Sequence, residues 1–299
     1  MLDLLFIFAP LAAGYGLRAF PKRWMAHVNT FTIVLIFLIL GLLGANLSSM
    51  GELAAQLGKA GKIAGTFYLT ITSANIFALW WVDRRINVTV TGKSKSLSLI
   101  HMLKDSFQLI GVVVLGLFIG QWFSISASFT SKAMEWSLFI LLFLIGVQLR
   151  SSELTLRQII LNRKGLIISA VVIVSSWMGG IIAGKLLALP LNMTLAFSSG
   201  FGWYSLSGIL IGDAFGPVMG AASFLNELLR ELTTLLFLPL LLPKNPLTAI
   251  GYAGATAMDF TLPIIQTTGG IHCVPIAIVS GFILSISMPI FVTLFVSLF

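Results

Sequence analysis

Long apolar runs separated by short polar gaps are the feature that most constrains how this chain can fold. A run of about 20 apolar residues is long enough to cross the hydrocarbon core of a bilayer as a helix. Apolar residues make up 58% of the 299 residues and charged residues only 9%, whereas soluble domains have about 25% charged residues. The chain therefore belongs in lipid, and little length remains for a soluble catalytic domain.

The runs predict an all-α polytopic membrane protein of about eight transmembrane helices plus two broken or re-entrant hairpin segments. The predicted full spans cover residues 2–19, 28–47, 63–82, 106–123, 134–149, 165–187, 217–242 and 272–298. Segments 195–216 and 249–270 are apolar but rich in Gly, Ser, Thr and Pro. Interrupted backbone at membrane depth is tolerated only inside protein or beside water. We therefore expect hairpins there, with ten full spans as the alternative.

Basic residues orient the predicted spans. Most of the 18 Lys and Arg residues fall in gaps on one side of the membrane, and that side is expected to be cytoplasmic. Both termini are then periplasmic. The two topologies differ only in the side of Lys244, so charge does not choose between them. The basic residues form no stripe that would bind nucleic acid, and we expect no metal or cofactor.

Internal repeats point to a symmetric architecture. Gly44-Ala-Asn-Leu matches Gly146-Val-Gln-Leu at an offset of 102 residues, and the two broken segments repeat at an offset of about 54. Spans 1–3 and 4–6 then form units with an odd number of passes, which makes them inverted repeats. Such repeats with interrupted helices are typical of secondary transporters. We expect a six-span N-terminal half, residues 1–190, and a C-terminal half, residues 191–299, that carries the transport site.

Charged residues within the predicted 217–242 span are the main candidates for function. Glu227 and Glu231 share a helix face, and Arg230 is three residues after Glu227, so Glu227 and Arg230 can pair. That leaves Glu231 as a carboxylate in the bilayer, which is costly unless it holds a cation or a proton. A charged cluster that only locks helices together is the alternative.

The broken segments carry further candidates. Asp259 lies among free backbone carbonyls and beside Thr261, which suits a cation, although a helix N-cap is the alternative. Tyr204 could face an aliphatic ammonium chain or simply pack. The other residues assigned to the substrate or proton site are Ser205, Ser207 and Asn226. Asn46, Gln148 and Asp213 are assigned to the pathway. Helix–helix hydrogen bonding is the alternative for the two amides, and a turn or a cap is the alternative for Asp213.

Motifs for catalysis are missing from the sequence. Gly92-Lys93-Ser94 lacks the earlier glycine of a phosphate-binding loop, where Asn87 stands. Ser205 and Ser207 have no base nearby in sequence. We therefore expect a transporter rather than an enzyme or an ATP-driven pump.

Several motifs resemble one family, the LysO-type lysine exporters of bacteria (a DUF340-type membrane protein family). They are GFGWYSLSGIL (200–210), FGPVMG (215–220), NELLREL (226–232), GATAMDFTLPIIQTTGG (254–270) and LLFLIGVQLRSSELTLRQIILNRKG (141–165). The resemblance covers most of the chain from about residue 105 onward and is weaker over 1–104.

The resemblance implies an inner-membrane exporter of L-lysine and its toxic analogues, driven by exchange with protons. It implies that Glu231 and Asp259 are the functional acidic residues, with acidic residues also usual at 227 and 213. The substrate carboxylate could rest on a half-helix N-terminus within residues 200–208. A sodium/proton or other cation antiporter is the alternative function. The oligomeric state stays open, with a homodimer as one arrangement.

Overall fold

A computed structural model shows an all-helical chain. It describes residues 9–10, 12–17, 22–48, 53–86, 88, 90, 99–123, 125–151, 162–258, 260–270 and 272–297, and contains no β-strand among them. The α-helices are α2 (Lys22–Ser48), α3 (Leu53–Asp83), α4 (Leu99–Phe123), α5 (Ala127–Ser151), α7 (Arg163–Leu187), α8 (Leu191–Phe197), α9 (Tyr204–Phe215), α10 (Pro217–Leu241), α11 (Pro246–Ala253), α12 (Leu262–Ile264) and α13 (Val274–Ser297). A 3-10 turn, η1 (Gly254–Met258), and a π turn, η2 (Ile265–Gly269), complete the described elements.

Five helices within the described ranges are long and apolar enough to cross a membrane. They are Trp24–Asn46, Gln56–Asp83, Ser128–Gln148, Arg163–Leu187 and Val274–Ser297. Each coincides with a predicted span, so the expectation of an all-α, multi-pass membrane protein is confirmed at that level. Helix α10 has 25 residues and is therefore about 37 Å long, but it carries three charged residues. The predicted span 2–19 lies largely outside the described residues.

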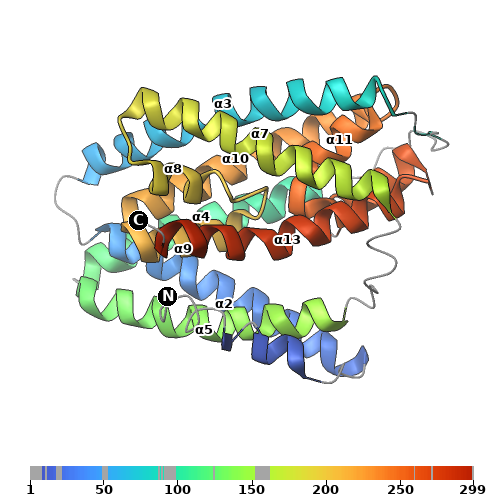
Figure 1. The fold of residues 1–299 in the computed structure, drawn as a ribbon. Helices are drawn as coiled ribbons and strands as arrows, with labels where there is room; N and C mark the ends of the chain where they lie inside the picture. Colours follow the sequence, from blue (N-terminus) through green and yellow to red (C-terminus); the bar gives the residue numbers. More distant parts are fainter. Residues whose placement is uncertain are drawn as a thin grey trace.

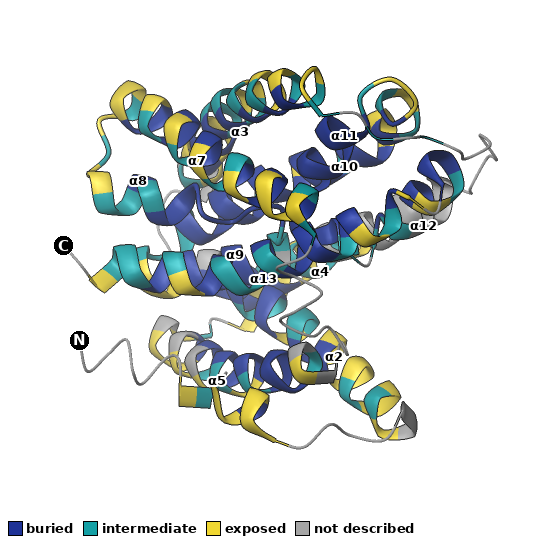
Figure 2. Cartoon of the chain, turned by 45° about the vertical axis from the view of Figure 1, so that its right-hand side comes forward, coloured by how far each residue is buried: buried dark blue, intermediate teal, exposed yellow. Residues whose placement is uncertain are grey.

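The helices form two bundles (Figure 1). The first, here the N-terminal bundle, consists of α2 packed against α4 and α5. The second, here the core bundle, contains α3 and α7 packed together and α8 to α13 around the long helix α10. Figure 2 shows that buried residues concentrate in α9, α10 and α11. Contacts between the bundles come mainly from α9 and α10 against α2, α4 and α5.

Glycines bring the helices of the N-terminal bundle into backbone contact. A Cβ added at Gly116 on α4 would collide with the carbonyl oxygen of Gly41 on α2. A Cβ added at Gly14 would collide in the same way with the carbonyl oxygen of Phe143 on α5. Gly14 is 102 residues before Gly116, and Phe143 is 102 residues after Gly41, so the offset of the sequence repeat relates the two contacts. Small residues at such crossings let membrane helices approach closely.

Both segments expected to be broken are interrupted in the structure. The first consists of α8, a turn through residues 198–203, and α9, and the turn has positive φ at Phe201 (49°) and Gly202 (94°). The second consists of α11, η1, α12 and η2, with positive φ at Gly254 (68°). In Figure 1, α8 and α9 lie toward the left end of the bundle and α11 toward the right. Their interrupted parts meet inside the core bundle.

Candidate functional site

The tips of the two interrupted segments touch each other. The backbone N–H of Ala255 donates a hydrogen bond to the carbonyl oxygen of Phe201, with an N···O distance of 2.9 Å. A Cβ added at Gly254 would collide with that same carbonyl oxygen. Gly254 also has a positive φ, so this contact requires a residue without a side chain. The two tips therefore form one joined structure at the centre of the core bundle.

Helix α10 satisfies the polar backbone groups of both tips. The Gly202 N–H donates to Glu227 Oε2 at 2.6 Å, and Asn226 Nδ2 donates to Glu227 Oε1 at 2.8 Å. On the other tip, Arg230 Nε donates to the Tyr252 carbonyl at 3.0 Å and a second guanidinium nitrogen donates to the Gly251 carbonyl at 3.4 Å. Glu227 and Arg230 thus bind different tips, and they also attract each other electrostatically.

Burial explains why these contacts matter. Asn226, Glu227, Arg230 and Glu231 are each 1–3% exposed. A buried backbone N–H or C=O without a partner costs about 1–3 kcal/mol, and a buried charge without a partner costs more. Glu227 accepts a hydrogen bond from a buried N–H group, and Arg230 donates to buried carbonyl groups. In each contact the backbone group and the charged side chain gain a partner, so neither is left buried without one. The charged residues of α10 therefore hold the interrupted segments in place.

A second carboxylate, that of Asp83, anchors the second interrupted segment from another helix. The carboxylate of Asp83, at the end of α3, accepts hydrogen bonds from the backbone N–H groups of Leu247 (3.0 Å) and Thr248 (2.6 Å). It also accepts one from the Thr248 hydroxyl at 2.6 Å. These are N–H groups of the first turn of α11, which have no partner within the helix and favour a negative charge. Asp83 thus acts as a cap supplied by another helix.

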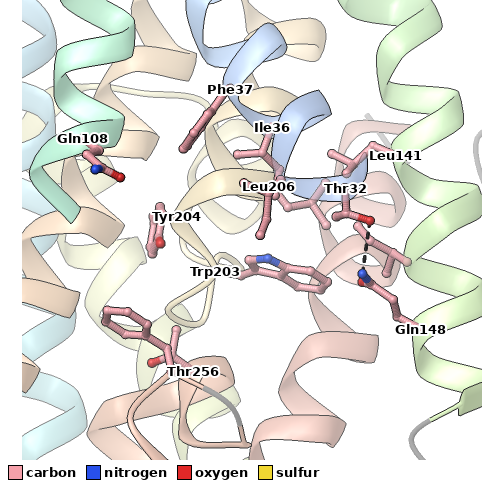
Figure 3. Close-up of a pocket in the computed structure, with 13 residues that line it drawn as sticks. Thr32, Ile36, Phe37, Gln108, Leu141, Gln148, Trp203, Tyr204, Leu206 and Thr256 are labelled. Carbon is pink, nitrogen blue, oxygen red and sulfur yellow. Dashed lines mark hydrogen bonds between the residues drawn. The ribbon is translucent and has the colours of Figure 1, made fainter. Parts of the chain in front are cut away.

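A cavity of about 690 Å³ lies between the two bundles, beside the joined tips (Figure 3). This volume falls within the range of small-molecule sites, about 300–1,000 Å³. The N-terminal bundle contributes Thr32, Ile33, Ile36, Phe37, Gln108, Leu141, Ile145 and Gln148. The core bundle contributes Trp203, Tyr204, Leu206, Thr256 and Phe260. The lining is aromatic and aliphatic, with several neutral polar groups and no charged side chain among these residues.

The residues proposed from the sequence separate into three groups. Tyr204 and Gln148 line the cavity, while Asn226, Glu227, Arg230 and Glu231 form the buried polar face of α10. Ser207 and Thr261 are fully buried and donate to nearby backbone carbonyls, those of Tyr204 at 3.4 Å and Thr256 at 3.0 Å.

The remaining candidates lie elsewhere. Asn46 is buried in α2 and Asp213 is exposed in α9, and neither lines the cavity. Asp259 and the side chain of Ser205 lie outside the described part of the chain.

Sequence reasoning missed most of the cavity wall contributed by the N-terminal bundle. Thr32 and Gln108 are polar residues within predicted apolar spans or at their ends, and that was the available signal. Thr256 stands three residues before Asp259 in the sequence. These three residues line one cavity because of the way α2 and α4 pack against the tips. A single sequence does not reveal that packing.

Membrane-length apolar helices define a multi-pass membrane protein, and interrupted segments of the kind found here are typical of transporters. A family model described as lysine exporter LysO matches residues 110–296. The lysine exporter LysO of Escherichia coli strain K12 is 43% identical over 293 residues, which cover 98% of each chain. A putative lysine exporter of Haemophilus influenzae is 40% identical over 190 residues, 64% of this chain and 97% of its own length. The chain therefore belongs to the lysine exporter LysO family.

Proposed function

We propose that this protein exports L-lysine and lysine analogues across the bacterial inner membrane in exchange for protons. The observation that carries the proposal is the cavity beside the joined tips, in a chain whose relatives are named lysine exporters. The substrate has two ammonium groups, one carboxylate and four methylene groups. Aromatic and aliphatic walls suit the methylene chain, and the polar groups that line the cavity suit the charged ends.

The two acidic residues emphasised by the sequence carry the exchange in this proposal. Glu231 lies one helical turn after Glu227 on α10 and is 2% exposed. Asp259 follows η1 directly in sequence and precedes Phe260, which lines the cavity. An ionised carboxylate attracts an ammonium group, and the same carboxylate with a proton releases it. Alternating occupancy by lysine and by protons would couple the two fluxes.

The substrate carboxylate has a matching partner at the start of α9. Trp203 and Tyr204 stand at the N-terminus of this helix and line the cavity. The first N–H groups of a helix favour an anion. Gly202 lies within the segment 200–208 that the sequence suggested for this role, but its N–H is already bonded to Glu227. In our proposal the substrate carboxylate therefore rests on the first turn of α9.

The topology that we propose has eight full spans, two hairpins that enter from opposite sides, and both termini in the periplasm. Asp83 and Lys244 stand at the ends of α3 and α10, next to the start of α11, in agreement with a cytoplasmic entry of the second hairpin. The glycine contacts related by a shift of 102 residues support an inverted repeat of spans 1–3 and 4–6. Labelling of a cysteine at Lys244 from the cytoplasmic side only is expected.

Counterflow in proteoliposomes tests the function. Vesicles loaded with unlabelled lysine and containing the purified protein should accumulate radiolabelled lysine, and an imposed proton gradient should change the rate. The alternative, a sodium/proton or other cation antiporter, predicts pH-coupled sodium flux without lysine exchange. Protein-free vesicles supply the background. Absence of lysine exchange in vesicles that hold folded protein would contradict the proposal.

A further inference from the structure

Gln148, near the end of α5, is held in one orientation at the cavity wall. Its Nε2 donates to Asn29 Oδ1 at 3.0 Å and to Thr32 Oγ1 at 3.1 Å, and both partners are on α2. Figure 3 shows the contact with Thr32. The hydroxyl of Thr32 donates its own proton to the Val28 carbonyl at 2.9 Å, so its oxygen can only accept. The side-chain amide must therefore turn its nitrogen toward α2.

The remaining polar atom of Gln148 is an acceptor. A side-chain amide has two N–H donors and one carbonyl oxygen, and both donors are used by Asn29 and Thr32. The oxygen Oε1 has no hydrogen-bond partner among the described residues. Because Gln148 lines the cavity together with Trp203 and Leu206, the N-terminal bundle presents a neutral, pre-oriented acceptor to whatever enters.

The rest of the cavity restricts what this acceptor can bind. Among the described residues that line it, no side chain is charged, and the indole of Trp203 lines the same cavity as Gln148. An aromatic face attracts an ammonium group and packs against methylene groups. A neutral oxygen beside an aromatic face suits the N–H groups of a primary ammonium at the end of an aliphatic chain.

We propose that Gln148 Oε1 accepts a hydrogen bond from the side-chain ammonium group of the substrate and thereby selects amino acids that end in a primary amine. This inference rests on the proposed function. The substrate then spans the interface, with its α-carboxylate and α-ammonium at the tips of the core bundle and its side-chain ammonium at the N-terminal bundle. Gln148 is a specificity-determining residue and takes no part in proton exchange.

The test compares two variants in the lysine counterflow assay. Gln148→Leu removes the acceptor while keeping a similar volume, and it should raise the KM for lysine roughly ten-fold or more, since the hydrogen bond lost is to a charged group. Asn29→Ala removes one anchor of the amide but leaves Oε1 and the Thr32 contact, and it should change KM by about two-fold or less. Both proteins should elute as folded material from detergent size exclusion.

A substrate analogue gives a second, independent readout. Nε-trimethyl-lysine keeps the positive charge but has no N–H donor on the side chain, so the wild type should prefer lysine over it. In Gln148→Leu that preference should largely disappear. If Gln148→Leu exchanges lysine with unchanged KM and unchanged preference, the assignment of Gln148 is wrong. If Asn29→Ala reproduces its defects, Gln148 only ties α5 to α2. Failure of the wild type to exchange lysine would instead overturn the proposed function.

Discussion

At the scale of single residues, we propose that the charges of α10 divide between structure and transport. Glu227 and Arg230 are occupied by the tips of the two interrupted segments. Glu231 lies on the same buried face, and Asp259 is adjacent in sequence to the second tip. Because the first pair holds backbone groups, its loss should affect folding. The second pair is assigned to substrate and proton, so its loss should affect transport.

The first prediction concerns the transport carboxylates. Glu231→Gln and Asp259→Asn should each abolish lysine export while leaving folded protein in the membrane, because an amide keeps the volume and removes the charge. Loss of one partner of a buried charged contact costs about 2–5 kcal/mol, which is roughly 30- to 4,000-fold in binding. The measurement is lysine efflux from cells loaded with a lysine dipeptide. Normal efflux with normal pH dependence in either variant would make that carboxylate structural.

The second prediction concerns the carboxylate that holds the first tip. Glu227→Gln keeps an acceptor for the Gly202 N–H but removes its charge, and should lower the free energy of unfolding by about 1–2 kcal/mol. Glu227→Ala leaves the N–H buried without a partner and should lower it by about 1–3 kcal/mol more. Thermal unfolding of the purified proteins in detergent measures both. Equal melting temperatures for wild type and Glu227→Ala would show that the contact contributes nothing.

At the scale of helices, most of the fold could be predicted from the sequence and the arrangement of the site could not. Apolar runs placed α2, α3, α5, α7 and α13 correctly, because span length is a local property. Gly, Ser and Pro content likewise identified both interrupted segments.

The contacts made by the interrupted segments depend on tertiary packing. The spacing of three residues indicates that Glu227 and Arg230 can interact, but it does not reveal that each side chain also binds the backbone of a different tip. The cavity wall on α2 also could not be predicted, because it depends on tertiary packing. In the sequence, Thr32 is only one hydroxyl residue within an apolar helix.

The third prediction concerns the capping of α11 by Asp83. Asp83→Asn removes the charge and one of the acceptor oxygens, and should destabilise the second interrupted segment by about 1–3 kcal/mol. Thr248→Val removes only the hydroxyl contact and should have a smaller effect in the same direction. Hydrogen–deuterium exchange over residues 246–258 measures the local opening. Unchanged exchange there in Asp83→Asn would refute the role of this cap.

The fourth prediction concerns the glycines at the helix crossings of the N-terminal bundle. Gly116→Ala and Gly14→Ala each place a Cβ against a backbone carbonyl, and overpacking of this kind costs about 1–3 kcal/mol or more. Both should lower the thermal stability, and by similar amounts if the two crossings are related by the repeat. Gly111→Ala on α4 is the matched control, because its added Cβ meets no atom of the described residues within 4 Å. A stable Gly14→Ala protein beside an unstable Gly116→Ala protein would argue against equivalent crossings.

At the scale of the whole molecule, the cavity lies between two bundles that are each more extensively packed within than against one another. We propose that a substrate bound between them reaches the two sides of the membrane in turn by movement of the bundles relative to each other. Gly212 on α9 and Leu43 on α2 face each other across the interface, with the position of a Gly212 Cβ 3.5 Å from Leu43 Cδ1. Gly41 and Val112 face each other within the N-terminal bundle, where the position of a Gly41 Cβ is 3.8 Å from Val112 Cγ1.

These two pairs give the last prediction. In a Cys273→Ser background, which removes the single native cysteine, a disulfide between Leu43→Cys and Gly212→Cys should stop lysine counterflow, and a reductant should restore it. The disulfide between Gly41→Cys and Val112→Cys joins α2 to α4 inside one bundle and should leave counterflow close to normal. Mass spectrometry establishes the fraction cross-linked in each sample. Because neither pair lines the cavity, a block in the first protein alone reports on movement rather than on occupancy of the substrate site. Full transport by protein with a completely formed Leu43–Gly212 disulfide would mean that the bundles move as one body.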